Sequence, residues 1–268
     1  MATAETPEPP PHTYVALGDS FASGPGLAPF ADPYCERSQR NYGHLVAEAL
    51  ELPAFVDGTC GGAVAENFWM SQKDGVAPQL DALTPDTDLV TVTIGGNDAG
   101  FVEVLATCGV LGLAPAVPDP CRTYYARTGS DELVRRMNEV VAPRIRAVFD
   151  GIRDRAPHAT IVATTYLHIL PDTGHCWPAI PFATGDLSWL AGVQRSLNSV
   201  ISTEARNAGI LVADMFAPSA EHDACRPADV RWTEPLTGTG PAPAHPNYAG
   251  MSKTAATVVS VLADHGMS

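Results

Sequence analysis

A serine near the start of the chain and a histidine near its end are suited by type and setting to nucleophilic chemistry. Ser20 follows the apolar run 14–17 at a glycine-containing turn, where a hydroxyl can project from the end of a strand. His245 stands beside Pro246 just before the last helical pattern, and an imidazole held in such a loop can take the proton of a serine hydroxyl. These two residues predict covalent attack by Ser20 with His245 as the base.

Attack on an acyl carbon also needs hydrogen-bond donors for the oxygen that becomes negative. Asn97, in the polar turn 95–98, can offer its side-chain amide, and Gly62 can offer a backbone N–H. Each feature alone also fits a plainer interpretation, because turns favour glycine, asparagine and aspartate, and most surface histidines have no catalytic role. The chemistry therefore depends on whether the fold brings these distant positions together.

The elements that must position these residues alternate between strand and helix. Short apolar runs predict strands at 14–17, 54–56, 89–94, 160–167 and 210–215. Apolar periodicity predicts helices over 38–50, with Ser38 as N-cap, 130–152, bent at Pro143, 186–207 and 250–264. Parallel strands need crossover connections, so this alternation predicts one doubly wound α/β domain with helices on both faces of the sheet. In such folds ligands bind beyond the carboxyl ends of the strands, which is where Ser20 and Asn97 fall.

Composition and charge limit the classes of function. The 268 residues include 30 acidic and 16 basic side chains, for a net charge of −14, which argues against nucleic acid and anionic membranes as partners. No uninterrupted apolar run reaches the ~18 residues of a membrane-spanning helix. Residues 1–12 are acidic and rich in proline and are expected to be a disordered tail, which leaves residues 13–268 as a single domain.

The cysteines indicate the compartment. They are even in number and form no C-x-x-C pair, which favours disulfide bonds over a zinc or redox site: Cys35, Cys60, Cys108, Cys121, Cys176 and Cys225. The N-terminus lacks the basic and apolar segments of a signal peptide, so the sequence is interpreted as the mature form of a secreted protein. Free thiols in a cytosolic enzyme are the alternative, and the residues alone leave the pairing open.

Several motifs occur together in a characteristic order. Gly18-Asp19-Ser20-Phe21, a glycine after the second strand, Gly95-Gly96-Asn97-Asp98 and His245-Pro246-Asn247 follow one another with the spacing of the GDSL, or SGNH, hydrolases. Across residues 13–264 the sequence resembles this family, and in particular its secreted actinomycete lipases and esterases with six cysteines.

The resemblance implies a fold, a mechanism and a disulfide pattern. The fold would be a flavodoxin-like three-layer sandwich with a parallel sheet of about five strands. Ser20 would be the nucleophile and His245 the base, with an oxyanion hole formed by the N–H of Ser20, the N–H of Gly62 and the amide of Asn97. The bridges would join Cys35 to Cys60, Cys108 to Cys121 and Cys176 to Cys225.

The sequence departs from the family pattern at two places. The pair Gly61-Gly62 stands where relatives often have serine and glycine, so Gly61 is the alternative oxyanion donor. The aspartate usually found three residues before the histidine is replaced by Ala242. We expect the main-chain carbonyl of Ala242 to orient His245, whereas a bond from the ring to a carboxylate such as Asp229 or Glu234 would contradict a Ser-His dyad.

The expected substrate is an ester with an apolar acyl group. Segments 108–121 and 176–182 are apolar where loops are usually polar, and at a cleft they could bind an acyl chain, although packing onto the core explains them equally well. Lipase, phospholipase and short-chain esterase activities stay open. The alternatives are a carbohydrate acetyl esterase and a binding protein on a retired hydrolase fold. Acyl transfer to water implies no metal or organic cofactor, and we expect a monomer.

Overall fold

The computed structural model describes residues 12–113, 117–127 and 131–267. Of the tail expected over residues 1–12, only His12 falls within these ranges, and the expected helix start at Ser130 lies outside them. No helix in the described ranges is long and apolar enough to cross a bilayer.

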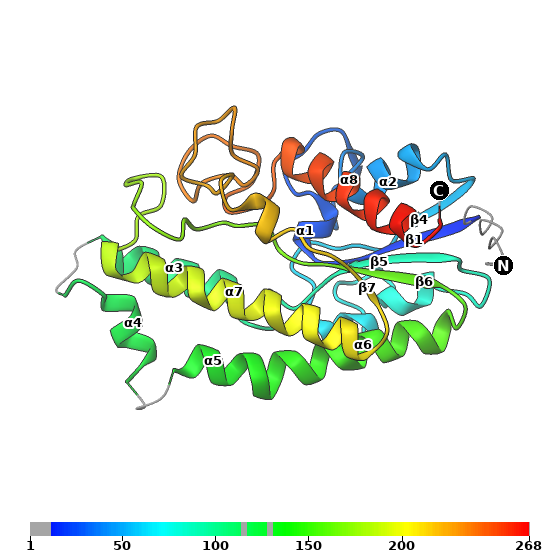
Figure 1. The fold of residues 1–268 in the computed structure, drawn as a ribbon, viewed down its shortest axis with the longest axis horizontal. Helices are drawn as coiled ribbons and strands as arrows, with labels where there is room; N and C mark the ends of the chain where they lie inside the picture. The colour runs from blue at the N-terminus through cyan, green and yellow to red at the C-terminus, as the bar shows by residue number, and fades with distance from the viewer. Residues whose placement is uncertain (1–11, 114–116, 128–130, 268) are drawn as a thin grey trace, which may run out of the picture.

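A parallel sheet of five strands forms the middle layer (Figure 1). Its strands are β1 (Thr13–Gly18), β4 (Ala54–Asp57), β5 (Leu89–Thr93), β6 (Thr160–Thr164) and β7 (Leu211–Ala213). Their spatial order is β4-β1-β5-β6-β7, which is the flavodoxin order and confirms the expected fold class. A separate antiparallel ribbon pairs β2 (Phe30–Asp32) with β3 (Arg37–Ser38).

The strand order creates a crevice where the site residues were expected. From β1 the chain crosses first to β4 on one side and later to β5 on the other. Connections that leave in opposite directions separate at the carboxyl ends of β1 and β5, which is where ligands bind in doubly wound sheets. Ser20 follows β1 and Asn97 follows β5, so both border this crevice.

Helices cover both faces of the sheet (Figure 1). On one face lie α2 (Tyr42–Ala49) and α8 (Tyr248–Asp264), with the short α1 (Ser20–Ser23) nearby. On the other face lie α6 (Ala142–Arg155) and α7 (Thr184–Asn207), followed toward one end by α3 (Phe101–Gly112), α4 (Pro120–Tyr125) and α5 (Glu132–Arg136).

Two helices begin or divide at other residues than expected. Ser38 belongs to β3 and does not cap α2; the cap is Asn41, whose side chain accepts the N–H of His44 at 2.9 Å. The helix expected over 130–152 is α5 and α6 joined by a π-helical turn, Met137–Val141. The turn lets Pro143 fall in the first turn of α6, where a missing N–H is tolerated.

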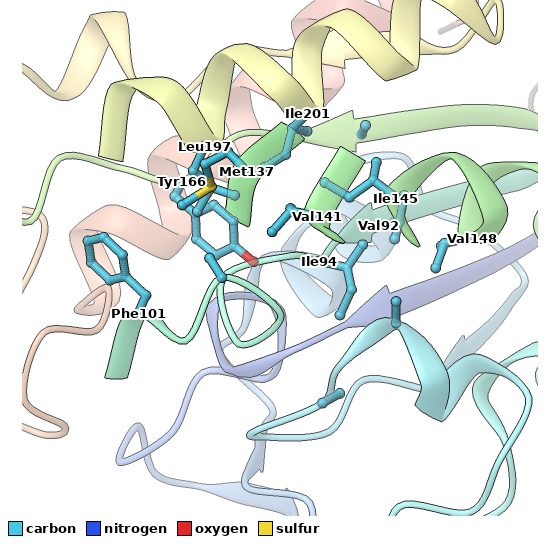
Figure 2. Packing of buried hydrophobic residues seen from close by; sticks show 14 of the residues in the cluster. Val92, Ile94, Phe101, Met137, Val141, Ile145, Val148, Tyr166, Leu197 and Ile201 are labelled. Carbon is cyan, nitrogen blue, oxygen red and sulfur yellow. The ribbon is translucent and has the colours of Figure 1, made fainter. Parts of the chain in front are cut away.

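Buried apolar side chains fill the space on both faces of the sheet. Figure 2 shows part of the larger cluster, in which Val92 of β5 lies near Ile145 and Val148 of α6, and Leu197 and Ile201 of α7 belong to the same cluster on that face of the sheet. A second cluster joins β1 to α2 and α8. Because every residue of β5 is buried, the strand ends that bear the site residues are held by a packed core.

Three disulfide bonds tie the loops together, and their pairing is the one that the resemblance implied. Cys35–Cys60 joins the ribbon to the loop after β4, Cys108–Cys121 joins α3 to α4, and Cys176–Cys225 joins two long loops. Cys108 lies inside α3, so the start of segment 108–121 is helical and not a loop as expected.

Candidate active site

Ser20 is fixed by the close approach of β1 to β5. Gly18, the last residue of β1, has φ +134°, and a Cβ there would lie 2.2 Å from the carbonyl oxygen of Thr93, so only glycine fits. The buried side chain of Gln79 accepts the Gly18 N–H at 2.7 Å and donates to its carbonyl at 2.9 Å. Ser20 therefore begins α1 from a backbone that is held on both sides.

The chain brings His245 to Ser20 across 225 residues of sequence. Ser20 Oγ lies 2.8 Å from His245 Nε2, and His245 Nδ1 lies 2.7 Å from the carbonyl oxygen of Pro243. A carbonyl can only accept, so Nδ1 carries the ring proton and Nε2 is free to accept the hydroxyl proton of Ser20. The geometry fixes the imidazole in the tautomer that a general base needs.

The electrostatic setting favours the neutral imidazole. Burial lowers the pKa of His245 below its ordinary value, while the hydrogen bond to Pro243 and the carboxylate of Glu36 oppose that shift. Glu36 is exposed, and it was not identified from the sequence. The carboxylate of Glu36 lies against the loop that carries Gly61 and Gly62, because a Cβ on Gly61 would lie 2.2 Å from Glu36 Oε2.

The residue that orients His245 differs from the expected one. The expected partner Ala242 was wrong, because Nδ1 bonds to the carbonyl of Pro243. The carbonyl of Ala242 accepts the backbone N–H of His245 at 3.3 Å, which closes a turn and curls the ring back over Pro243. The carboxylate of Glu234 is held by Arg231 and Asn247 at 2.6 and 3.1 Å.

Three hydrogen-bond donors could bind a negative oxygen near Ser20: the N–H of Ser20, the N–H of Gly62 and one amide hydrogen of Asn97. The Gly61 N–H donates to the carbonyl of Cys35 at 2.9 Å, whereas the Gly62 N–H meets no acceptor in the described part of the chain. Gly62 has φ +79°, a conformation that favours glycine. The side-chain amide of Asn97 donates one hydrogen to the carbonyl of Ala63 at 2.9 Å, and its second hydrogen has no acceptor among the described residues. The Ser20 N–H, first in α1, has no helical acceptor.

Tyr166, two residues beyond the end of β6, links the motif 18–21 to the motif 95–98, and it was not identified from the sequence, where it fell inside the strand predicted over 160–167. Its hydroxyl accepts the Gly96 N–H at 2.8 Å and donates to Asp19 Oδ2. Asp19 Oδ1 also accepts the N–H of Phe21 at 2.9 Å. Burial raises the pKa of Asp19 to about 7, although the bond from Tyr166 lowers it. A buried chain of hydrogen bonds thus connects the Ser20 turn to the Asn97 turn.

Asp98 fixes the segment that carries Gly62 and Ala65. Its buried carboxylate accepts the N–H of Ala65 and pairs with the guanidinium of Arg144, both at 3.0 Å. Ala65 and Gly62 lie on the same short loop, and Asp98 follows Asn97 directly. The loop that carries the Gly62 N–H is therefore fixed relative to Asn97 before any ligand binds.

An apolar cavity of about 430 Å³ opens beside Ser20 and His245. Asn97 also borders it, and α3 with its C-cap residue Leu113 forms one wall. Val110 and Leu113 belong to the segment in which an acyl site was expected. The second expected segment contributes only Pro181, since Ile180 and Phe182 are buried and Trp177 borders a separate hollow. The volume is within the range of small-molecule sites, and the lining is mostly apolar, with Ser20, Asn97 and His245 among its polar side chains.

Comparison with known proteins places this geometry in a family. The model of the GDSL-like lipase/acylhydrolase family matches residues 16–253. The chain belongs to this family. Lipase 2 of Streptomyces coelicolor is 38% identical over 256 residues, covering 93% of this chain and 85% of the relative. The lipase of Streptomyces rimosus is 29% identical over 242 residues, covering 90% and 82%.

Solved structures agree with the family assignment. Phospholipase A1 from Streptomyces albidoflavus has a TM-score of 0.77 and 29% identity, covering 93% of this chain and 99% of that one. An acetyl xylan esterase, at a TM-score of 0.52 and 13% identity, shares the fold alone. Relatives named lipase and esterase, together with the family, show that this GDSL protein is a carboxylic ester hydrolase.

Proposed function

We propose that this GDSL hydrolase cleaves acyl esters of lipids through an acyl-enzyme on Ser20. One observation carries the proposal: Ser20 and His245 are hydrogen-bonded at 2.8 Å in the lining of an apolar cavity. A nucleophile paired with its base supplies the chemistry, and the apolar cavity supplies a place for the acyl chain.

In the first half of the reaction, Ser20 Oγ bonds to the acyl carbon while its proton passes to His245 Nε2. The carbonyl oxygen becomes negative and is met by the N–H groups of Ser20 and Gly62 and by the free amide hydrogen of Asn97. His245 then gives its proton to the leaving alcohol oxygen as the carbon–oxygen bond breaks, which leaves the acyl group on Ser20.

In the second half, water attacks the acyl carbon while Nε2 of His245 takes its proton. The intermediate collapses, the bond to Ser20 Oγ breaks, and the proton returns from His245 to Ser20 with release of the fatty acid. Throughout the cycle the carbonyl of Pro243 holds Nδ1 at 2.7 Å. It orients the ring as a carboxylate would, without a full charge to stabilise the imidazolium.

The cavity favours a lipid acyl group over the acetyl group of a carbohydrate ester. Its walls away from Ser20 are mainly aliphatic, from Leu105, Ile169, Leu197 and Leu236, whereas a sugar needs polar partners and aromatic faces. The relatives named lipase and phospholipase A1 support the same choice. Three disulfides and a related extracellular lipase from Streptomyces rimosus support an extracellular location.

Active-site labelling combined with a substrate panel tests this proposal. A fluorophosphonate should label the wild type and fail to label Ser20→Ala, and hydrolysis of esters from acetyl to palmitoyl should fall to background in Ser20→Ala and in His245→Ala. Ser196→Ala, on the far side of α7 from the cavity, is the matched control and should label and turn over normally. Absence of labelling in the folded wild type would favour a binding protein, and turnover of acetyl esters alone would favour a carbohydrate esterase.

A further inference from the structure

Helix α3 forms one wall of the cavity with a single arc of its residues. The residues of α3 and its C-cap that border the cavity are separated by one and three positions in alternation, which places them on one side of the helix: Phe101, Val102, Leu105, Ala106, Gly109, Val110 and Leu113. Within this arc Leu105, Gly109 and Leu113 form the central row, because residues four apart lie one above the other. Position 109 therefore faces the middle of the cavity.

Nothing in the packing of α3 requires glycine at position 109. A Cβ there would lie 3.7 Å from Cε1 of Phe182 and 3.9 Å from Cγ of Pro181, which is ordinary van der Waals contact. Gly112, one turn further on, is different, because its Cβ would lie 2.3 Å from the carbonyl oxygen of Pro181. Glycine is the poorest helix former apart from proline, so Gly109 destabilises α3. The packing around position 109 does not explain why a glycine is there.

We propose that Gly109 is a specificity-determining position that keeps the far half of the cavity open to long linear acyl chains. This inference rests on the proposed function. A side chain larger than methyl at this position would fill the gap between α3 and Pro181 and extend into the cavity. The absence of a side chain leaves a passage between the Ser20 end and Leu113.

The position of Gly109 along α3 sets the chain length at which it matters. An α-helix rises ~1.5 Å per residue, so Gly109 lies about 12 Å beyond Phe101, the α3 residue next to the Asn97 turn. A fully extended chain of single bonds advances about 1.2 Å per bond, so this distance corresponds to about ten carbons. Acetyl and butyryl groups end before Gly109, whereas dodecanoyl and palmitoyl groups extend past it.

The test compares kcat/KM for p-nitrophenyl esters from acetyl to palmitoyl in wild type and Gly109→Leu. The variant should keep the wild-type kcat/KM for acetyl and butyryl esters and lose more than roughly tenfold for dodecanoyl and palmitoyl esters. Each methylene that no longer enters the apolar cavity reduces kcat/KM by about fourfold. Gly109→Ala, whose methyl fits, should melt at or above the wild-type temperature and show a smaller loss confined to the same long esters.

Gly192→Leu is the matched control. Gly192 lies inside helix α7, a Cβ there meets no described atom within 4 Å, and the residue does not border the cavity. This variant should keep the chain-length profile of the wild type. If Gly109→Leu lowered kcat/KM equally for all esters, or left long esters unaffected, the assignment of Gly109 would be overturned.

Binding measurements separate this inference from the proposed function. Calorimetry on Ser20→Ala protein should show that Gly109→Leu weakens binding of palmitate more than tenfold and leaves butyrate unchanged. If the wild type failed to hydrolyse any ester while this difference persisted, the proposed function would fail and the role of Gly109 would stand. Equal binding of palmitate with and without the leucine would overturn the role of Gly109 even in an active enzyme.

Discussion

Replacing Tyr166 by phenylalanine removes one oxygen atom from the buried chain between the two motifs. The hydroxyl accepts the Gly96 N–H at 2.8 Å and donates to the carboxylate of Asp19, and both groups are buried. A hydrogen bond to a charged group is worth about 1.5 to 3 kcal/mol, and a buried N–H left without a partner costs about 1 to 3 kcal/mol. We expect Tyr166→Phe to lower the free energy of unfolding by roughly 2.5 to 6 kcal/mol.

The loss of stability in Tyr166→Phe should depend on pH because the carboxyl group of Asp19 titrates. Burial raises the folded pKa of Asp19 from 3.8 to about 7, so the stability that its protonated form provides is present below pH 3.8 and lost as the pH rises through about 7. The bond from Tyr166 lowers this pKa, so its removal raises the folded pKa further. The variant therefore keeps losing stability above pH 7, where the wild type levels off, and the difference between them widens from pH 5 to pH 9.

Urea unfolding of wild type and Tyr166→Phe across this pH range measures the effect. Tyr14→Phe is the matched control, since that tyrosine is equally buried but its hydroxyl bonds to the neutral hydroxyl of Thr91 at 2.7 Å. It should cost about 1 kcal/mol at every pH in the range. A loss in Tyr166→Phe that is the same at pH 5 and pH 9 would refute the reasoning that Asp19 titrates in contact with Tyr166.

The same variant should also affect turnover, because the hydroxyl of Tyr166 helps hold the Ser20 and Asn97 turns in register. We expect kcat to fall by roughly 10-fold to 100-fold, since displacements of up to 1 Å in an active site have effects of this size. KM should change little, because the ring remains in the cavity wall. A variant with normal kcat would show that the two turns keep their positions without this hydrogen bond.

Three further predictions concern the amide of Asn97, the disulfide Cys35–Cys60 and the pKa of His245. Asn97→Ala should lower kcat by roughly 10² to 10³ with little change in KM, measured by steady-state kinetics, and an unchanged kcat would remove Asn97 from the oxyanion hole. Replacing Cys35 and Cys60 together by serine should lower the free energy of unfolding in urea by about 3.5 kcal/mol, from the loop-entropy cost of the 25-residue separation, whereas a loss under about 1 kcal/mol would contradict that origin. Because burial lowers the pKa of His245 and the base must be neutral, the acid limb of kcat/KM should lie below pH 6.5, and a limb above that value would contradict the buried imidazole.

The layers of the fold could be predicted from the pattern of apolar residues. Strand runs such as 89–94 are apolar and β-branched because both faces are buried, and the helices between them carry one apolar face, so local pattern and tertiary position coincide. The resemblance to the GDSL hydrolases, carried by the order of the motifs, implied that Ser20 and His245 meet and how the six cysteines pair, whereas the residues alone left the pairing open.

Which groups contact Ser20 and His245 could be read only from the arrangement of distant segments in the folded chain. The carbonyl of Pro243 rather than that of Ala242 reaches Nδ1, because a turn closed by the N–H of His245 directs the ring back by two residues instead of three. Among the described residues the Gly62 N–H has no acceptor, whereas the Gly61 N–H donates to the carbonyl of the disulfide-linked Cys35. Tyr166 meets Asp19 across 147 residues. These contacts depend on the direction of single bonds between distant segments, and neither periodicity nor composition contains that information.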